Sequence, residues 1–183
     1  IDVQSALSRG ITVTNTPGVL TEDTADMTMA LVMAVARRIP EGAKVITDEQ
    51  WHGWSPTWMM GRRITGKRLG IIGMGRIGQA IAARARPFGL SIHYHNRSQL
   101  RPDQAQGATY HATLDELMAN SDVCCICAPS APELKGAINA HRLALLPHNA
   151  MLVNVARGDL VDEDALFAHI ATGRLSGIAM DVY

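Results

Sequence analysis

The stretch LGIIGMGRIG, Leu69–Gly78, decides the fold of this chain. It opens with an apolar run, Leu69–Ile72, which is typical of a short buried strand, and a helical pattern follows it. Between strand and helix, the glycines Gly73, Gly75 and Gly78 form the spacing G-x-G-x-x-G. In this context the spacing predicts a tight turn from a strand into a helix that binds a dinucleotide.

Each glycine of the loop has its own physical role. Gly73 permits the tight turn, Gly75 lets a pyrophosphate approach the backbone, and Gly78 lets the helix pack closely against the strand. The first helical residues, Arg76 and Ile77, present N–H groups without partners at the positive end of the helix dipole. We therefore assign all five positions to the dinucleotide-binding site.

Working outward, short apolar segments alternate with helical segments along most of the chain. Strands that are apolar on both faces, with helices between them, predict an α/β protein with a doubly wound parallel sheet of the Rossmann type. The expected strands are Leu69–Ile72, Ser91–His95, Ala108–Tyr110, Val123–Cys127, Met151–Val155 and Leu175–Met180, and the expected helices are Arg76–Phe88, Arg101–Gln106, Thr113–Asn120, Ala140–Leu146 and Asp162–Thr172.

The segment before the glycine loop has a different pattern. Ile11–Asn15 alternates like a short strand, and Thr21–Ile39 has an apolar helical stripe with Thr24 as a possible cap. A second helical segment runs toward Gln50, and an irregular loop rich in tryptophan, Trp51–Gly61, follows it.

Composition excludes several classes of protein. Hydrophobic residues make up 47% of the 183 residues, and 17 basic residues balance 17 acidic ones, so we expect a globular protein that binds neither nucleic acid nor anionic membranes. No apolar run approaches the roughly 20 residues of a membrane span. The three cysteines, Cys124, Cys125 and Cys127, lie too close together for a disulfide framework, which favours a reducing, cytoplasmic location. Their alternation along one strand favours core packing over a metal site.

Asn96, Arg97 and Ser98 follow the expected second strand and bear on the choice of coenzyme. An enzyme that prefers NAD places Asp or Glu there to bind the ribose hydroxyls. This chain has no carboxylate at that point to repel a 2′-phosphate, Arg97 supplies a fork-shaped cation, and Asn96 and Ser98 supply further donors. The sequence therefore predicts NADP(H) in preference to NAD(H).

Together with the glycine loop and Asn96–Ser98, the run VNVARGDLVD, Val153–Asp162, resembles the D-isomer-specific 2-hydroxyacid dehydrogenases. Within that family, the pattern WxxWxPxW over Trp51–Trp58 and the run GIIGMGRIGQA, Gly70–Ala80, look most similar to glyoxylate/hydroxypyruvate reductases. The resemblance covers almost the whole chain. It implies reduction of a small 2-keto acid to the D-2-hydroxy acid by hydride transfer from NADPH, in a homodimer of two-domain subunits. Dimerisation also suits the apolar surface that Thr21–Ile39 and the tryptophan loop provide.

The resemblance also implies site residues. Arg157 matches the catalytic arginine that pairs with the substrate carboxylate and polarises the keto oxygen, which suits a planar guanidinium at the end of a parallel strand. Trp54 matches an aromatic residue that reaches the partner's substrate pocket, although burial in the dimer contact is an equal alternative. The remaining matches concern the coenzyme: Asp181 at the nicotinamide carboxamide, Val155 and Ala156 as backbone contacts to the ring, and Ala128 and Pro129 in the loop after the fourth strand.

The proton donor of the family is a histidine supported by a glutamate, and we expect both beyond Tyr183. His93 and His95 lie near the adenosine end, and His148 lies at the wrong edge of the sheet. The other four histidines, His52, His111, His141 and His169, are typical of ordinary surface positions. We expect residues 1–183 alone to bind NADPH without turnover.

The two ends of the sequence predict that it is part of a longer chain, because it begins without methionine and stops after an apolar run. Ile11–Asn15 resembles the last strand of a flavodoxin-like substrate domain. We therefore assign residues 1–16 to the end of that domain and the crossover, and residues 17–183 to the dinucleotide-binding domain.

Two alternative functions remain: a non-catalytic, corepressor-like dimer that senses the dinucleotide, or another family member such as a phosphoglycerate or formate dehydrogenase. The Asn96–Ser98 run and the tryptophan loop count against these two dehydrogenases.

Overall fold

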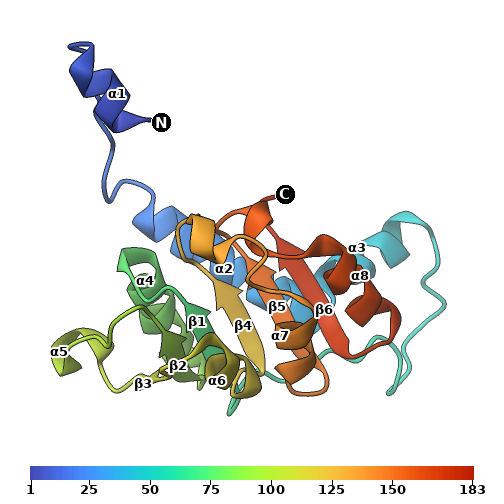
Figure 1. Cartoon of the computed structure of the whole chain (residues 1–183). Coiled ribbons are helices and arrows are strands. Elements are labelled where there is room, and N and C mark those ends of the chain that lie inside the picture. The colour runs from blue at the N-terminus through green and yellow to red at the C-terminus, as the bar shows by residue number, and fades with distance from the viewer.

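A parallel sheet with helices on both faces forms the body of the computed structural model, which describes all 183 residues (Figure 1). The strands are β1 (Arg68–Ile72), β2 (Ser91–His95), β3 (Thr109–Tyr110), β4 (Val123–Ile126), β5 (Ala150–Asn154) and β6 (Leu175–Met180). The α-helices are α1 (Val3–Ser8), α2 (Thr21–Arg37), α3 (Ile39–Thr47), α4 (Arg76–Ala85), α5 (Pro102–Ala105), α6 (Leu114–Ala119), α7 (Ala140–Leu145) and α8 (Glu163–Ala171). Short 3₁₀ turns are η1 (Arg86–Phe88), η2 (Pro132–Leu134) and η3 (Gly158–Leu160).

The strand order is β3-β2-β1-β4-β5-β6 and every pairing is parallel, which confirms the predicted doubly wound Rossmann-type sheet. The order in which successive strands join the sheet reverses between β1 and β4, which run parallel with Ile72 opposite Ile126. Ligands of open α/β sheets bind outside the carboxyl ends of the strands at such a switch point. The loops after β1, β4 and β5 meet at this edge.

Side chains of the central strands alternate between two apolar cores. Leu69, Ile71 and Cys125 belong to the core under α2 and α4, whereas Cys124 and Ile126 belong to the core under α6 and α7. The expected alternation of the cysteines is thus confirmed. Burial raises the pKa of the Cys124 thiol to about 12, so this cysteine stays protonated and behaves as an apolar core residue.

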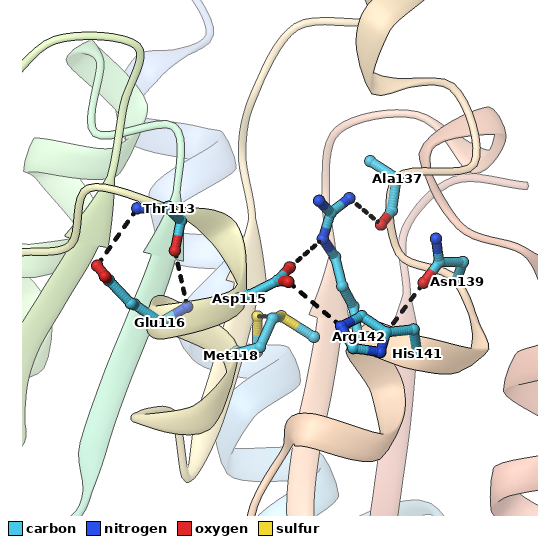
Figure 2. Close-up of polar contacts among 9 residues, drawn as sticks. Thr113, Asp115, Glu116, Met118, Ala137, Asn139, His141 and Arg142 are labelled. Carbon is cyan, nitrogen blue, oxygen red and sulfur yellow. Dashed lines mark hydrogen bonds and ion pairs between the residues drawn. The ribbon is translucent and has the colours of Figure 1, made fainter.

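A polar network joins α6 to α7 (Figure 2). Thr113 and Glu116 form a capping box at the start of α6, and Asp115 projects from the same turn toward α7. Its carboxylate accepts from Arg142 Nε at 2.7 Å and lies 3.2 Å from His141 Nε2. Arg142 also donates to the carbonyl of Ala137 at 2.8 Å, so one side chain ties both helices to the loop before α7.

Two expectations for the N-terminal segment are wrong. Ile11–Asn15 forms no strand, because none of the six strands lies beside it to pair its backbone groups, and α1 stands away from the sheet (Figure 1). Helix α2 begins at Thr21, three residues before the expected cap, and the Thr24 carbonyl instead accepts from Thr28 Oγ1 inside the helix at 2.7 Å. The tryptophan loop is irregular, as expected.

None of the helices combines the length and the apolar character that crossing a bilayer requires.

Candidate functional site

The glycine loop after β1 lies at the switch point of the sheet. Gly73 has a φ of +95°, and a Cβ there would lie 2.7 Å from the backbone nitrogen of Ala128, so the turn accepts only glycine. The N–H of Gly73 donates to the His95 carbonyl at 3.1 Å, which fixes the loop against the end of β2. A Cβ at Gly78 would lie 2.5 Å from the Gly73 carbonyl oxygen, so strand and helix approach as closely as the spacing predicted.

The start of α4 is suited to an anionic ligand. No side chain caps the helix, and the N–H groups of Gly75, Arg76 and Ile77 have no hydrogen-bond partner in the chain. A Cβ at Gly75 would meet no atom within 4 Å, so open space lies in front of these donors. Free N–H groups, a helix dipole and an open approach fit the pyrophosphate of a dinucleotide.

A cleft of about 370 Å³ opens on the β2 side of the loop. Asn96, Arg97 and Ser98 lie in its wall. The Asn96 Oδ1 accepts from the Met74 N–H at 2.6 Å, so the oxygen of this amide holds the glycine loop and only its NH₂ group is free to donate outward. The side chains of Arg97 and Ser98 are exposed and form no hydrogen bond within the chain. A phosphate on the ribose would therefore meet a cation that has no competing partner.

A second cleft of about 580 Å³ lies on the β5 side of the loop. Gly73, Gly75, Ala128 and Pro129 line both clefts, so the two form one groove across the carboxyl edge of the sheet. Val155, Ala156 and Arg157 also line the second cleft. Along one groove the structure thus brings together the predicted phosphate loop, the residues after β2, the loop after β4 and the turn after β5.

Arg157 is exposed and has no carboxylate partner in the chain. Its Nη1 donates to the Ala156 carbonyl at 2.6 Å, which leaves the other nitrogen donors for a ligand. Asp181 and Trp54 do not line either cleft. The Asp181 N–H donates to the Asn154 carbonyl at 2.9 Å beside the turn, and Trp54 is 80% exposed in its loop.

The histidines lie away from Arg157, since none lines the cleft on the β5 side. His95 lies in the wall of the cleft on the β2 side. The expectation that His111 is an ordinary surface residue is wrong, because its Nε2 lies 2.9 Å from Nδ1 of His93 and the two rings stack. Desolvation lowers the pKa of both imidazoles, and for His93 the neighbouring His111 lowers the pKa further.

Sequence reasoning missed parts of the groove. Thr16, Pro17 and Gly18 line the cleft on the β5 side, and Glu133 lines the other. The turn chemistry of Thr16–Gly18 was visible in the sequence, but only the folded chain shows that the turn crosses the carboxyl edge of the sheet. Glu133 carries no local signal, because an acidic residue in a loop is usually just solvated.

Fold and groove together define a dinucleotide-binding domain. Residues 29–183 match the family described as "D-isomer specific 2-hydroxyacid dehydrogenase, NAD binding domain". The chain therefore belongs to the D-isomer specific 2-hydroxyacid dehydrogenase family, as its motifs predicted.

Relatives agree with this assignment. The chain is 41% identical to a glyoxylate reductase of Thermococcus kodakarensis over 187 residues, which cover 100% of this chain and 56% of that protein. A solved structure from Polaromonas sp. that is assigned to the same family has a TM-score of 0.96 at 46% identity, with 100% of this chain and 57% of that chain covered. An NADPH-dependent glyoxylate/hydroxypyruvate reductase of Sinorhizobium meliloti, solved with NADP and malonate, has a TM-score of 0.90 at 36% identity and covers 100% of this chain and 56% of its own. The chain thus spans about half the length of these relatives.

Proposed function

We propose that the whole protein reduces a small 2-keto acid, glyoxylate or hydroxypyruvate, to the D-2-hydroxy acid with NADPH. The observation that carries this proposal is the exposed guanidinium of Arg157 in the same groove as the free N–H groups of the glycine loop. A dinucleotide on the loop would bring its reactive end toward this arginine. The names of the relatives from Thermococcus and Sinorhizobium support the same class of substrate.

In this proposal the chain's own residues bind and polarise the substrate. The Arg157 guanidinium pairs with the substrate carboxylate and draws electron density toward the keto oxygen. When bound, the reduced nicotinamide supplies a hydride to the keto carbon. The keto oxygen also needs a proton, and no histidine lines the cleft around Arg157. We assign that proton to a histidine with a supporting glutamate outside residues 1–183.

The proposed preference for NADP(H) rests on the residues after β2. Arg97 and Ser98 face the cleft without partners in the chain, and the residue after β2 is an amide, Asn96, in place of a carboxylate. A cationic and uncharged polar set attracts a 2′-phosphate, whereas a carboxylate would repel it. The NADPH-dependent relative from Sinorhizobium is in line with this preference.

We further propose a homodimer and a division of the chain at residue 16. Apolar side chains stay exposed along α3 and the tryptophan loop, more than a monomer usually leaves in contact with water: Ile39, Ile46, Trp51, Trp54, Trp58 and Met60. A partner subunit that covers this surface would give Trp54 either a buried contact or a place at the partner's substrate.

In the proposed division of the chain, residues 1–16 belong to the substrate domain and its crossover, and residues 17–183 belong to the coenzyme domain.

The experiment that tests the function measures NADPH oxidation by the full-length protein with glyoxylate, hydroxypyruvate and 3-phosphohydroxypyruvate. The expected result is turnover of the first two and a loss of kcat/KM of at least about 100-fold in Arg157→Ala. Arg101→Ala is the matched control, because Arg101 is an exposed arginine that pairs with Asp103 and lies outside both clefts. Binding of NADPH without any turnover would favour the sensor alternative, and turnover of the phosphorylated acid alone would favour a phosphoglycerate dehydrogenase.

A further inference from the structure

We propose that Asn154 is the positioning residue that shapes the turn presenting Arg157 to the substrate. The inference rests on the proposed function, because it assigns a second residue to the same site. Asn154 is the last residue of β5 and is completely buried, directly after four apolar residues, Ala150–Val153. An apolar residue would suit this place in the core equally well, so the amide needs a specific explanation.

The two ends of the amide bind the backbone of the turn that follows. The Asn154 Oδ1 accepts from the Ala156 N–H at 3.0 Å, and the Nδ2 donates to the Arg157 carbonyl at 2.8 Å. Since an N–H needs an acceptor and a carbonyl needs a donor, these partners permit only one orientation of the amide. Both bonds end within three residues of Asn154, so they fix the path of the chain between β5 and Arg157.

Other contacts hold the downstream side of the turn. The Asp159 Oδ2 accepts from Ser130 Oγ at 3.0 Å, and the Asp159 carbonyl accepts from the Gly136 N–H at 2.8 Å. A Cβ at Gly158 would overlap the backbone of Tyr183, so the chain after Arg157 has no room to shift in that direction. Asn154 is the corresponding side-chain anchor on the upstream side. Without it, only backbone bonds of Asn154 and Val155 hold the upstream side.

The other fully buried polar side chains act differently. Thr28 and Ser121 each donate a hydroxyl to a carbonyl four residues earlier in or after a helix, at 2.7 and 2.6 Å. Neither side chain contacts the groove. Among these three buried polar residues, only Asn154 forms side-chain hydrogen bonds with the turn that carries Arg157.

A substitution of Asn154 removes hydrogen bonds of the side chain and leaves the hydrogen bond of its backbone carbonyl in place. Its carbonyl accepts from the Asp181 N–H at 2.9 Å, and this bond survives any change of the side chain. In Asn154→Asp the volume and the acceptor for Ala156 remain, but an oxygen replaces the donor and faces the Arg157 carbonyl. The substitution therefore disturbs Arg157 and leaves the glycine loop and the backbone contact of Asp181 in place.

The test uses the full-length protein, with Asn154→Asp and Asn154→Ala compared with the control Ser121→Ala. Because a displacement of about 1 Å at a reacting group costs on the order of 100-fold, we expect kcat/KM for the keto acid to fall about 10- to 100-fold. The Kd of NADPH should stay within about twofold of wild type, because the phosphate loop is unchanged. Ser121→Ala should keep its kcat/KM within about twofold, even if its melting temperature falls.

A double-mutant cycle separates positioning from general stability. If Asn154 acts through Arg157, adding Asn154→Asp to Arg157→Ala should cost less than about twofold more. The proposal would be overturned if Asn154→Asp lowered kcat/KM by the same factor in wild type and in Arg157→Ala. An unchanged kcat/KM in both Asn154 variants would also overturn it.

Hydrogen exchange keeps the proposal testable if the wild-type protein reduces no keto acid, which would refute the proposed function alone. Exchange of the amides in residues 155–158 should be faster in both Asn154 variants than in wild type and Ser121→Ala. Unchanged exchange in these residues would overturn the positioning role. If Asn154→Asp does not fold, Asn154→Ala carries the same measurements, since it removes both bonds without burying a charge.

Discussion

Replacement of Arg97 by alanine should shift the coenzyme preference toward NADH. The Arg97 guanidinium lies in the wall of the cleft on the β2 side and has no carboxylate partner in the chain, so its charge is available to a 2′-phosphate. A hydrogen bond to a charged group contributes about 1.5–3 kcal/mol, and about 1.4 kcal/mol corresponds to tenfold in affinity. Because Arg97 is exposed and solvent screens the pair, we expect the lower end of this range, roughly tenfold weaker NADPH binding.

The assay is a fluorescence titration of the full-length protein with NADPH and, separately, NADH. Arg97→Ala should raise the Kd of NADPH by roughly tenfold and leave the Kd of NADH within about twofold, because NADH has no group for this cation. Arg97→Asp should shift the ratio of the two Kd values further toward NADH than Arg97→Ala does, since a carboxylate repels the 2′-phosphate and can accept from the ribose hydroxyls. Arg101→Ala, an exposed arginine outside both clefts, is the control and should change neither Kd.

Two results would refute this reasoning. One is a wild-type protein that binds NADH as tightly as NADPH. The other is an Arg97→Asp variant whose ratio of the two Kd values equals that of wild type, which would mean that Arg97 does not reach the ribose.

Three further predictions concern the loop, the histidine pair and the α6–α7 network. Gly75→Ala should weaken NADPH binding at least tenfold in the same titration while the melting temperature stays unchanged, because the added Cβ meets only the space for the phosphates. Denaturant unfolding should show that the free energy of unfolding falls as pH drops below about 6.5. The pKa values of His93 and His111 are lowered in the folded chain, so the unfolded chain binds these protons at a higher pH than the folded chain does. His111→Gln should reduce that fall, and an identical pH profile would contradict the assignment. Asp115→Asn should cost about 0.5 kcal/mol of unfolding free energy at neutral pH. Since the Arg142 hydrogen bond lowers the pKa of Asp115, this difference should vanish only in acid, as the folded carboxylate is protonated.

The sequence alone determined the architecture and most of the groove. Buried parallel strands must be apolar on both faces, so Leu69–Ile72 and Val123–Cys127 were recognisable without tertiary information. The glycine spacing predicted the tight turn from β1 into α4, because a tight turn and a close approach of strand and helix each require glycine at a fixed position. The run around Arg157 identified the family, because such a motif is local in the sequence.

Contacts between distant segments were decided only by the tertiary structure. Ile11–Asn15 alternates like a strand, but strand formation depends on a neighbour to pair with, and this chain supplies none there. His111 pairs with His93 because β2 and β3 lie side by side, a contact that no local pattern encodes. The same holds for Asn154. The sequence shows its place at the end of an apolar run, but its burial and the two hydrogen bonds of its amide exist only in the folded chain.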